Sequence, residues 1–250
     1  MVFKVLLNIL LVLISTFGFL FAFVAAGSLM TFLSYIPSPK VNVSEVHWTT
    51  ATIWALTVNT SLLCLFMFQH SAMAKPFFKR ALYTSGLQVA ERSIYVIATS
   101  IALQCVTQYW QPIPWLSLWH IDTSGRVLWT VFTVVHCFAW CVIYIGTLMM
   151  DIGEMFGIKQ VYYSLCGLPD PLTFKSRELR RFYLHMRHPS FIGFCALLWI
   201  YPVMSLDRVL LAGLWTIYMM VAWNVDRFDY QYQCQQLRRK QYKVNSKLMY

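Results

Sequence analysis

Long apolar segments constrain this chain more than any other feature of its sequence. A helix needs about 20 residues to cross about 30 Å of hydrocarbon, and several segments approach that length. The 250 residues are 58% hydrophobic and only 12% charged, about half the charged fraction of an average soluble domain. The sequence therefore predicts an all-α, polytopic membrane protein. Its four longest predicted spans cover residues 5–33, 52–73, 94–109 and 127–150.

Two shorter apolar segments follow a polar connection. They cover residues 191–203 and 209–224, and only residues 204–208 separate them. This spacing is typical of either a tight helical hairpin or a partly inserted re-entrant pair, and Pro202 favours a kink or a helix end. We therefore expect about six transmembrane helices. They would form a single membrane domain, residues 1–250, with residues 151–189 as its longest polar loop.

Basic residues predict the orientation of the chain. All but three of its 20 Lys and Arg residues fall on one side of the predicted spans, and the exceptions are Lys40, Arg126 and Arg208. Membrane proteins retain positive charge on the cytoplasmic side. Both termini are therefore expected on that side, and for a protein of the endoplasmic reticulum or nuclear membrane the opposite side is the lumen. The opposite, lumenal side is predicted to carry an aromatic belt of Tyr109, Trp110, Trp115 and Trp119.

Several function classes are disfavoured. The net charge of +10 belongs to loops that flank spans, so direct nucleic-acid binding is not expected. The seven cysteines include no C-x-x-C pair, and neither a disulfide framework nor a metal site is predicted. A transporter is disfavoured because the predicted spans contain no Asp, Glu, Lys or Arg. His136 is their only deep ionisable group, and we interpret it as a packing and hydrogen-bonding residue rather than a proton carrier.

The long polar loop carries two candidate binding features. Its second half is predicted to form an amphipathic helix, which either lies on the membrane surface or packs on the bundle. Earlier in the loop, Tyr162 and Tyr163 form an aromatic patch that fits a pocket wall and an ordinary turn equally well. The apolar stripe of the helix consists of Leu179, Phe182, Tyr183 and Met186.

The richest group of polar residues lies where this loop enters the last hairpin. Here Arg187, His188 and Pro189 precede Phe191 and Gly193. Arginine and imidazole at the mouth of a span can hold an anionic or nucleotide-like ligand, while proline and glycine shape the backbone that carries them. We therefore regard this segment as the main candidate site.

Acidic and histidine side chains on the same predicted side extend this candidate site. Asp226 and Asp229 lie one helical turn apart after the last span, so they either face a ligand or pair with nearby arginines. His70 and His185 are further candidates around a ligand. The alternative for His70 is an interfacial imidazole that is hydrogen-bonded to a helix-end carbonyl.

Several short segments, in order along the chain, resemble a known family, the nurim family of multispanning inner nuclear membrane proteins of animals. The resemblance implies residence in the nuclear inner membrane, or otherwise in the endoplasmic reticulum membrane. It also implies a structural or interaction role without established catalysis, with nuclear-envelope or lamina-associated proteins as partners. The segments are Gln69-His70-Ser71, Gln111-Pro112-Ile113-Pro114, residues 157–163, Arg187-His188-Pro189 and Asp207-Arg208.

Residues 187–250 are also similar to the isoprenylcysteine carboxyl methyltransferase superfamily. That superfamily carries Arg-His-Pro-x-Tyr-x-Gly, a helical hairpin and a Glu-Glu pair, which build an S-adenosylmethionine site. The resemblance implies an alternative function, an S-adenosylmethionine-dependent methyltransferase acting on a lipophilic, prenylcysteine-like substrate. Arg187, His188, Pro189 and Gly193 keep the pattern, Phe191 replaces its tyrosine, and Asp226 and Asp229 stand near the place of its acidic pair.

Overall fold

Four long helices dominate the computed structural model, which describes residues 2–35, 50–176, 190–222, 231, 234–239 and 241–242. Each is long and apolar enough to cross a membrane. They confirm the four longest predicted spans and the all-α membrane architecture. The four helices are α1 (Val2–Ser34), α2 (Thr50–Met73), α4 (Glu91–Tyr109) and α5 (Arg126–Met149).

The two shorter apolar segments form a hairpin of unequal arms. The first arm contains α9 (Phe191–Trp199), and the second is α10 (Leu206–Ala222). The nine described residues of α9 rise only about 14 Å, roughly half of a hydrocarbon core. The predicted run 191–203 is therefore not one continuous helix. Its helix ends three residues before Pro202, as expected of a residue that disfavours helix before it.

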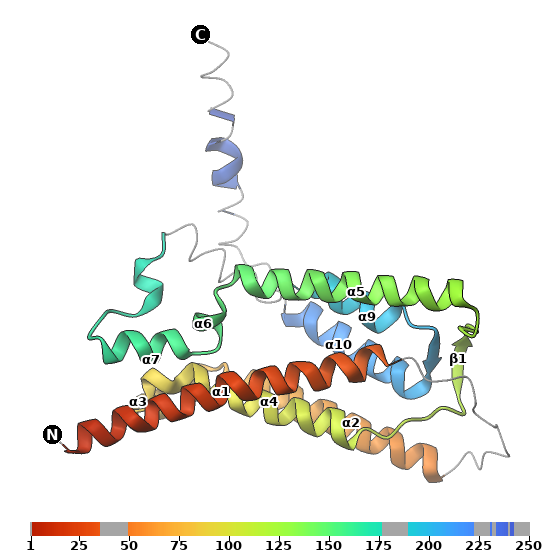
Figure 1. Ribbon diagram of the computed structural model, residues 1–250, viewed down its shortest axis with the longest axis horizontal. Coiled ribbons are helices and arrows are strands. Elements are labelled where there is room, and N and C mark those ends of the chain that lie inside the picture. Colours follow the sequence, from red (N-terminus) through yellow and green to blue (C-terminus); the bar gives the residue numbers. More distant parts are fainter. Residues whose placement is uncertain are drawn as a thin grey trace.

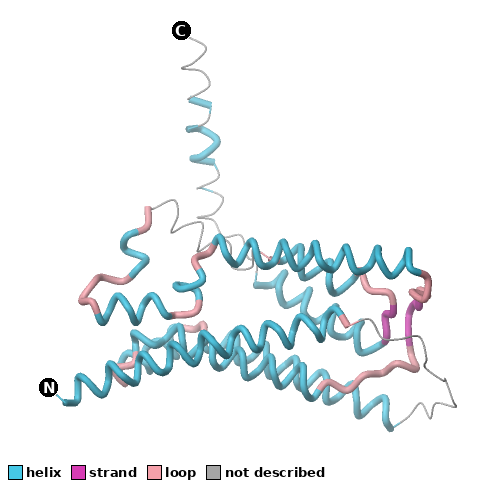
Figure 2. The backbone as a smooth tube through the Cα atoms, viewed as in Figure 1, coloured by secondary structure: helices cyan, strands magenta, loops and turns pink. Residues whose placement is uncertain are grey.

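A small β-ribbon closes one end of the bundle, and the sequence analysis did not predict it. Strand β1 (Ser117–His120) pairs antiparallel with β2 (Val203–Ser205), with an irregularity in register between Ser117 and Trp119. Two further backbone bonds flank the ribbon, from Ile121 N to Pro202 O and from Leu206 N to Leu116 O, each 2.8 Å. The ribbon therefore ties the α4–α5 connection to the α9–α10 hairpin. We call this the β-ribbon end (Figures 1 and 2).

The core lies between the helices and leaves their outer faces exposed. In Figure 1, α1 runs along α4, and α5 covers α9. A glycine permits the second contact, because a Cβ on Gly193 would lie 2.7 Å from Ile143 Cγ1 and 2.9 Å from Ala139 O. Apolar side chains on the outer faces, such as Phe138 of α5, are well exposed, as expected of surfaces that contact lipid. The central core joins Leu33, Leu63, Val106, Leu197 and Leu211 from five helices.

Short helices gather at the opposite end, which we call the α3–α7 end (Figure 1). Helix α1 rises about 50 Å, more than a bilayer core requires, and its first half packs here. Leu11 of α1 is buried with Ala90 and Val161. Gly157 has a φ of 91° and lies directly against Ser93. The elements at this end are α3 (Pro76–Thr84), η1 (Gln88–Ala90), α6 (Ile152–Met155), α7 (Ile158–Leu165) and η2 (Pro171–Phe174).

Candidate functional site

Most of the predicted methyl-donor group lies outside the described residues. The roles that the sequence assigns to these residues stay predictions. The same holds for the amphipathic helix predicted over residues 179–186. The predicted site residues outside the described ranges are His185, Arg187, His188, Pro189, Asp226 and Asp229.

The two described members of that group lie at the start of α9 and contribute to packing. Phe191 packs against the central core cluster. Gly193 is buried where α9 approaches α5, and the space that a Cβ would need is already filled by Ile143 and by the Ala139 carbonyl. The glycine therefore has a structural explanation in helix packing.

His70 lies at a junction of three helices. The hydroxyl of Tyr95, on α4, is 2.9 Å from both ring nitrogens of His70. The Phe66 ring stacks on the imidazole at 5.5 Å between centroids, and Tyr218 of α10 approaches it edge-on at 6.3 Å. Tyr218 also shares a 3.0 Å hydrogen bond with Ser71. The His70 side chain therefore contacts residues of two other helices. The Tyr95 hydroxyl also makes a long hydrogen bond of 3.4 Å to the backbone carbonyl of His70.

Tyr162 and Tyr163 lie on α7, at the α3–α7 end. Their rings meet edge-on at 6.0 Å, and Tyr163 makes a similar contact with Phe174 at 5.9 Å. Lys159 lies over the Tyr163 ring at 5.8 Å. Tyr162 is exposed. The predicted aromatic patch is thus present, on a surface rather than in a buried wall.

Three lysines at this end form direct ion pairs with acids, whereas Arg92 donates to the backbone at Met155 O. Lys175 Nζ lies 2.5 Å from Glu154 Oε2, where the Glu154 side chain is buried and the Lys175 side chain is half-buried. Lys159 Nζ donates to Asp151 Oδ2 at 2.6 Å. This hydrogen bond holds the pKa of the Asp151 carboxyl below its usual value, and the bond from the Glu154 N–H acts in the same direction.

Two adjacent charged residues at the β-ribbon end, Asp207 and Arg208, were not predicted to belong to a site. The predicted connection 204–208 is in fact β2 and the first turn of α10, so Asp207 and Arg208 belong to a helix. Asp207 is 4% exposed. Its two oxygens accept hydrogen bonds from Trp110 Nε1 at 2.9 Å and from Ile113 N at 3.0 Å. Asp207 therefore fastens the connection after α4 to the start of α10.

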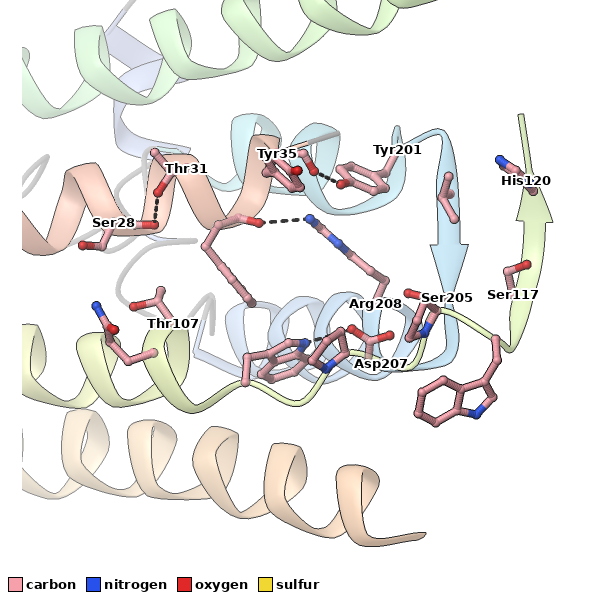
Figure 3. A pocket seen from close by; sticks show the side chains of 17 residues that line it. Ser28, Thr31, Tyr35, Thr107, Ser117, His120, Tyr201, Ser205, Asp207 and Arg208 are labelled. Carbon is pink, nitrogen blue, oxygen red and sulfur yellow. Dashed lines mark hydrogen bonds between the residues drawn. The ribbon is translucent and has the colours of Figure 1, made fainter. Parts of the chain in front are cut away.

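Arg208 instead binds the end of α1. Its guanidinium donates to Leu33 O at 3.2 Å and to Phe32 O at 3.0 Å, the latter drawn in Figure 3. The last carbonyls of a helix lack partners within it and carry the negative end of its dipole, so a cation is well placed there. The guanidinium carbon also lies 3.7 Å from the centroid of the Tyr201 ring, a cation–π contact.

Tyr201, His136 and Trp140 also hold the end of α1, and together with Arg208 they form what we call the α1 clasp. Tyr201 donates its hydroxyl to Tyr35 O. Trp140 Nε1 donates to Ser34 Oγ at 2.8 Å, and Ser34 Oγ lies 3.0 Å from His136 Nδ1. His136 Nε2 lies 2.9 Å from Ile200 O. Because a carbonyl only accepts, Nε2 carries the proton, and His136 makes the packing and hydrogen-bonding contacts that the sequence analysis expected of it.

A cavity of about 740 Å³ opens beside the α1 clasp (Figure 3). It lies between the ends of α1 and α4 on one side and the β-ribbon and the start of α10 on the other. Two of the predicted belt tryptophans, Trp110 and Trp115, line it, Trp119 lies in the adjoining strand β1, and the indole N–H groups of all three bond inside the protein. Trp110 donates to Asp207, Trp115 to Thr52 Oγ1 at 3.1 Å, and Trp119 to Tyr201 O at 2.9 Å.

Comparison with known proteins places the chain in a family. No family model matches the chain, and no solved structure matches it. It is 40% identical over 245 residues to a nurim homolog of Drosophila pseudoobscura pseudoobscura, covering 93% of this chain and 94% of that protein. It is 37% identical to the nurim homolog of Drosophila melanogaster, covering 96% and 97%. Nurim of Homo sapiens is 36% identical, with 91% and 89% covered. The chain therefore belongs to the nurim family.

Proposed function

We propose that this chain is a multispanning resident of the nuclear inner membrane with a structural or interaction role. The observation that carries the proposal is membership of the nurim family over nearly the whole chain. The fold is compatible with it, because the described ranges from residue 2 to residue 222 consist mostly of helices that pack into one bundle. Nuclear-envelope or lamina-associated proteins are the proposed partners.

The distribution of charge supports an orientation with both termini toward the nucleoplasm. Lys75, Lys79 and Arg80 lie at the α3–α7 end, whereas Arg126 lies at the β-ribbon end and Arg208 is used inside the α1 clasp. Basic residues favour the cytoplasmic or nucleoplasmic side of a membrane. The β-ribbon end would then face the lumen.

Methyl transfer with S-adenosylmethionine is the second candidate, and it rests on the sequence similarity of residues 187–250. The described part of that segment gives it little support. A glycine that cradles a cofactor would leave open the space where a Cβ is missing, but at Gly193 side-chain and backbone atoms of α5 fill that space. We therefore rank the structural role first.

The localisation and the orientation can be tested together with a split fluorescent protein. The small fragment is fused after Tyr250, and the large fragment is confined to the nucleoplasm, to the cytosol or to the endoplasmic reticulum lumen. The proposal predicts a fluorescent nuclear rim with the nucleoplasmic fragment and no signal with the lumenal one. A matched fusion within the α1–α2 connection, residues 36–49, should respond only to the lumenal fragment. A reticular signal without a rim, or the reverse orientation, would contradict the proposal.

A further inference from the structure

The cavity at the β-ribbon end has the size and shape of a small-ligand site. Its volume of about 740 Å³ falls within the range of typical ligand pockets, roughly 300–1,000 Å³. It lies where four segments meet, namely the last turns of α1 and α4, the β-ribbon and the first turn of α10. These segments are tied to one another by the ribbon, Asp207 and Arg208. Helix ends and the β-ribbon, together with the connection after α4, therefore form the wall of the cavity.

Apolar and aromatic side chains supply most of its wall. Phe32 and Tyr35 come from the end of α1, Trp110 follows α4, and Tyr201 lies between α9 and β2. Hydroxyl groups lie deeper along the helices. Figure 3 shows Ser28 and Thr31 on α1 and Thr107 on α4, on facing sides of the same hollow. A ligand that fits this lining needs an apolar chain together with a polar head.

Arg208 defines the charge of that head. Two of its N–H groups bond the α1 carbonyls, and a guanidinium has more donors than these two bonds use. The other charged residue of the wall is Asp207, and both of its oxygens already accept N–H groups, from Trp110 and Ile113. No ion pair joins the two residues in the described part of the chain. No described carboxylate therefore contacts the guanidinium directly, and a guanidinium with donors to spare suits an anion.

The position of the cavity indicates where such a ligand comes from. Helices α1, α2, α4 and α5 all begin or end at the β-ribbon end, next to tryptophan side chains. Helix ends and tryptophans of this kind occur at the headgroup level of a bilayer. We propose that the cavity binds an amphiphile with an anionic phosphate or carboxylate head, placed at Arg208, and with its chain against the aromatic wall. A bilayer lipid and a free single-chain amphiphile share this chemistry.

The proposal is tested on the full chain in a neutral detergent. The probes are 1-oleoyl lysophosphatidic acid and 1-oleoyl lysophosphatidylcholine, which share a chain but differ in head charge. The melting temperature is followed during titration. The anionic probe is expected to raise it at concentrations about tenfold lower than the zwitterionic probe, because its head carries a net negative charge, whereas choline balances the phosphodiester of the zwitterionic probe. Equal effects of the two probes would overturn the proposal.

A matched pair of variants locates the binding. Thr107→Phe adds a ring to the cavity, and the Thr107 hydroxyl bonds only the Gln104 carbonyl of its own helix in the described contacts. The control is Thr133→Phe on α5, whose hydroxyl likewise bonds its own helix, at Trp129 O, and which does not line the cavity. Thr107→Phe should weaken the effect of the anionic probe about tenfold. Thr133→Phe should leave it unchanged.

A second variant covers the case in which Thr107→Phe does not fold. Thr31→Phe adds a ring to the same wall from α1, at an exposed residue whose hydroxyl bonds Ser28 O. Retention of the full anionic effect in a folded cavity variant would overturn the proposal. This outcome is independent of nuclear localisation, so the two proposals can fail separately.

Native mass spectrometry distinguishes the two sources. The protein is released from nanodiscs of phosphatidylcholine alone or with phosphatidic acid added. Retention of phosphatidic acid by the wild type, reduced in Thr107→Phe, would identify a bilayer lipid as the ligand. Lysophosphatidic acid is added in a parallel sample. Retention of this lipid alone would identify a free single-chain amphiphile as the ligand. Retention of neither lipid would contradict the site.

Discussion

The two ends of the bundle use charge in different ways. At the α3–α7 end, three acids pair directly with lysines, such as Glu154 with Lys175, and Arg92 is the exception because it donates to Met155 O at 2.6 Å. At the β-ribbon end, Asp207 and Arg208 are neighbours in sequence but serve different partners. The carboxylate holds the connection after α4, and the guanidinium holds the end of α1. Adjacent opposite charges in a membrane protein can therefore fasten two separate helix ends instead of neutralising each other.

Removal of the Arg208 guanidinium should have the largest effect. Arg208→Ala leaves two α1 carbonyls without their donors and removes the contact with Tyr201. We expect a loss of about 3 kcal/mol in the free energy of unfolding, since hydrogen bonds to charged groups contribute about 1.5–3 kcal/mol each. The measurement is the melting temperature in detergent, reported by a thiol-reactive dye on the seven free cysteines. The control is Arg126→Ala, at an exposed residue of the same end, and an equal loss in both would refute the α1 clasp.

Replacement of Gly157, at the α3–α7 end, should cause the second-largest loss of stability. In Gly157→Ala the new Cβ would meet Ser93 Oγ at 2.4 Å, at a φ of 91°. We expect a loss of about 2–3 kcal/mol from overpacking and backbone strain together. Gly86→Ala is the control, because Gly86 has a φ of 73° but no atom within 4 Å of the added Cβ. It should cost about 1 kcal/mol, and equal melting temperatures for the two variants would show that α7 does not dock on α4.

Neutralisation of Asp207 should have a smaller effect. Asp207→Asn keeps the shape of the side chain but places an amide N–H opposite Trp110 Nε1 or Ile113 N. We expect a loss of about 1–2 kcal/mol for the donor left without an acceptor. Asp122→Asn is the control, since Asp122 accepts from the Ser124 backbone and hydroxyl in an exposed turn. If Asp122→Asn were the more harmful change, the proposed anchoring by Asp207 would be wrong.

Acidification should have the smallest effect, at the surface pair of the α3–α7 end. The pKa of Asp151 is lowered by its bond from Lys159. The stabilisation is therefore complete above the pKa of the unfolded state and is lost as the pH falls through the lower folded-state pKa. The difference in melting temperature between wild type and Asp151→Asn should shrink over that acidic window. A difference that stays constant with pH would show that the ion pair contributes nothing.

The sequence predicts the membrane helices because their length and apolarity act locally. The four long spans are found within a few residues of their predicted bounds. The β-ribbon depends on pairing between residues far apart, Ser117 with Ser205, and neither four-residue β1 nor three-residue β2 carries a periodic signal. The sequence predicts that Asp207 and Arg208 lie in a connection, because charged residues next to an apolar segment usually mark the end of that segment. Their burial depends on the ends of α1 and α4, which the local sequence does not specify.

The candidate site, like the fold, is predicted by the sequence only in part. The aromatic patch of Tyr162 and Tyr163 and the interhelical place of His70 could be anticipated as possibilities, but their partners Phe174, Tyr95 and Tyr218 come from tertiary contact. The motif predicts a role in cofactor binding for Gly193, whereas its neighbours on α5 explain the glycine by packing. A chain position that fits a motif can thus be required by the fold alone.

Binding of S-adenosylmethionine is the most direct test of an architectural rather than a catalytic role. Isothermal calorimetry would compare detergent-purified wild type with Arg187→Ala, after both have been shown to melt cooperatively. An architectural role predicts no saturable binding by either protein. Saturable binding by the wild type that is lost in Arg187→Ala would contradict it, and would establish a methyl-donor site at the entry to the last hairpin.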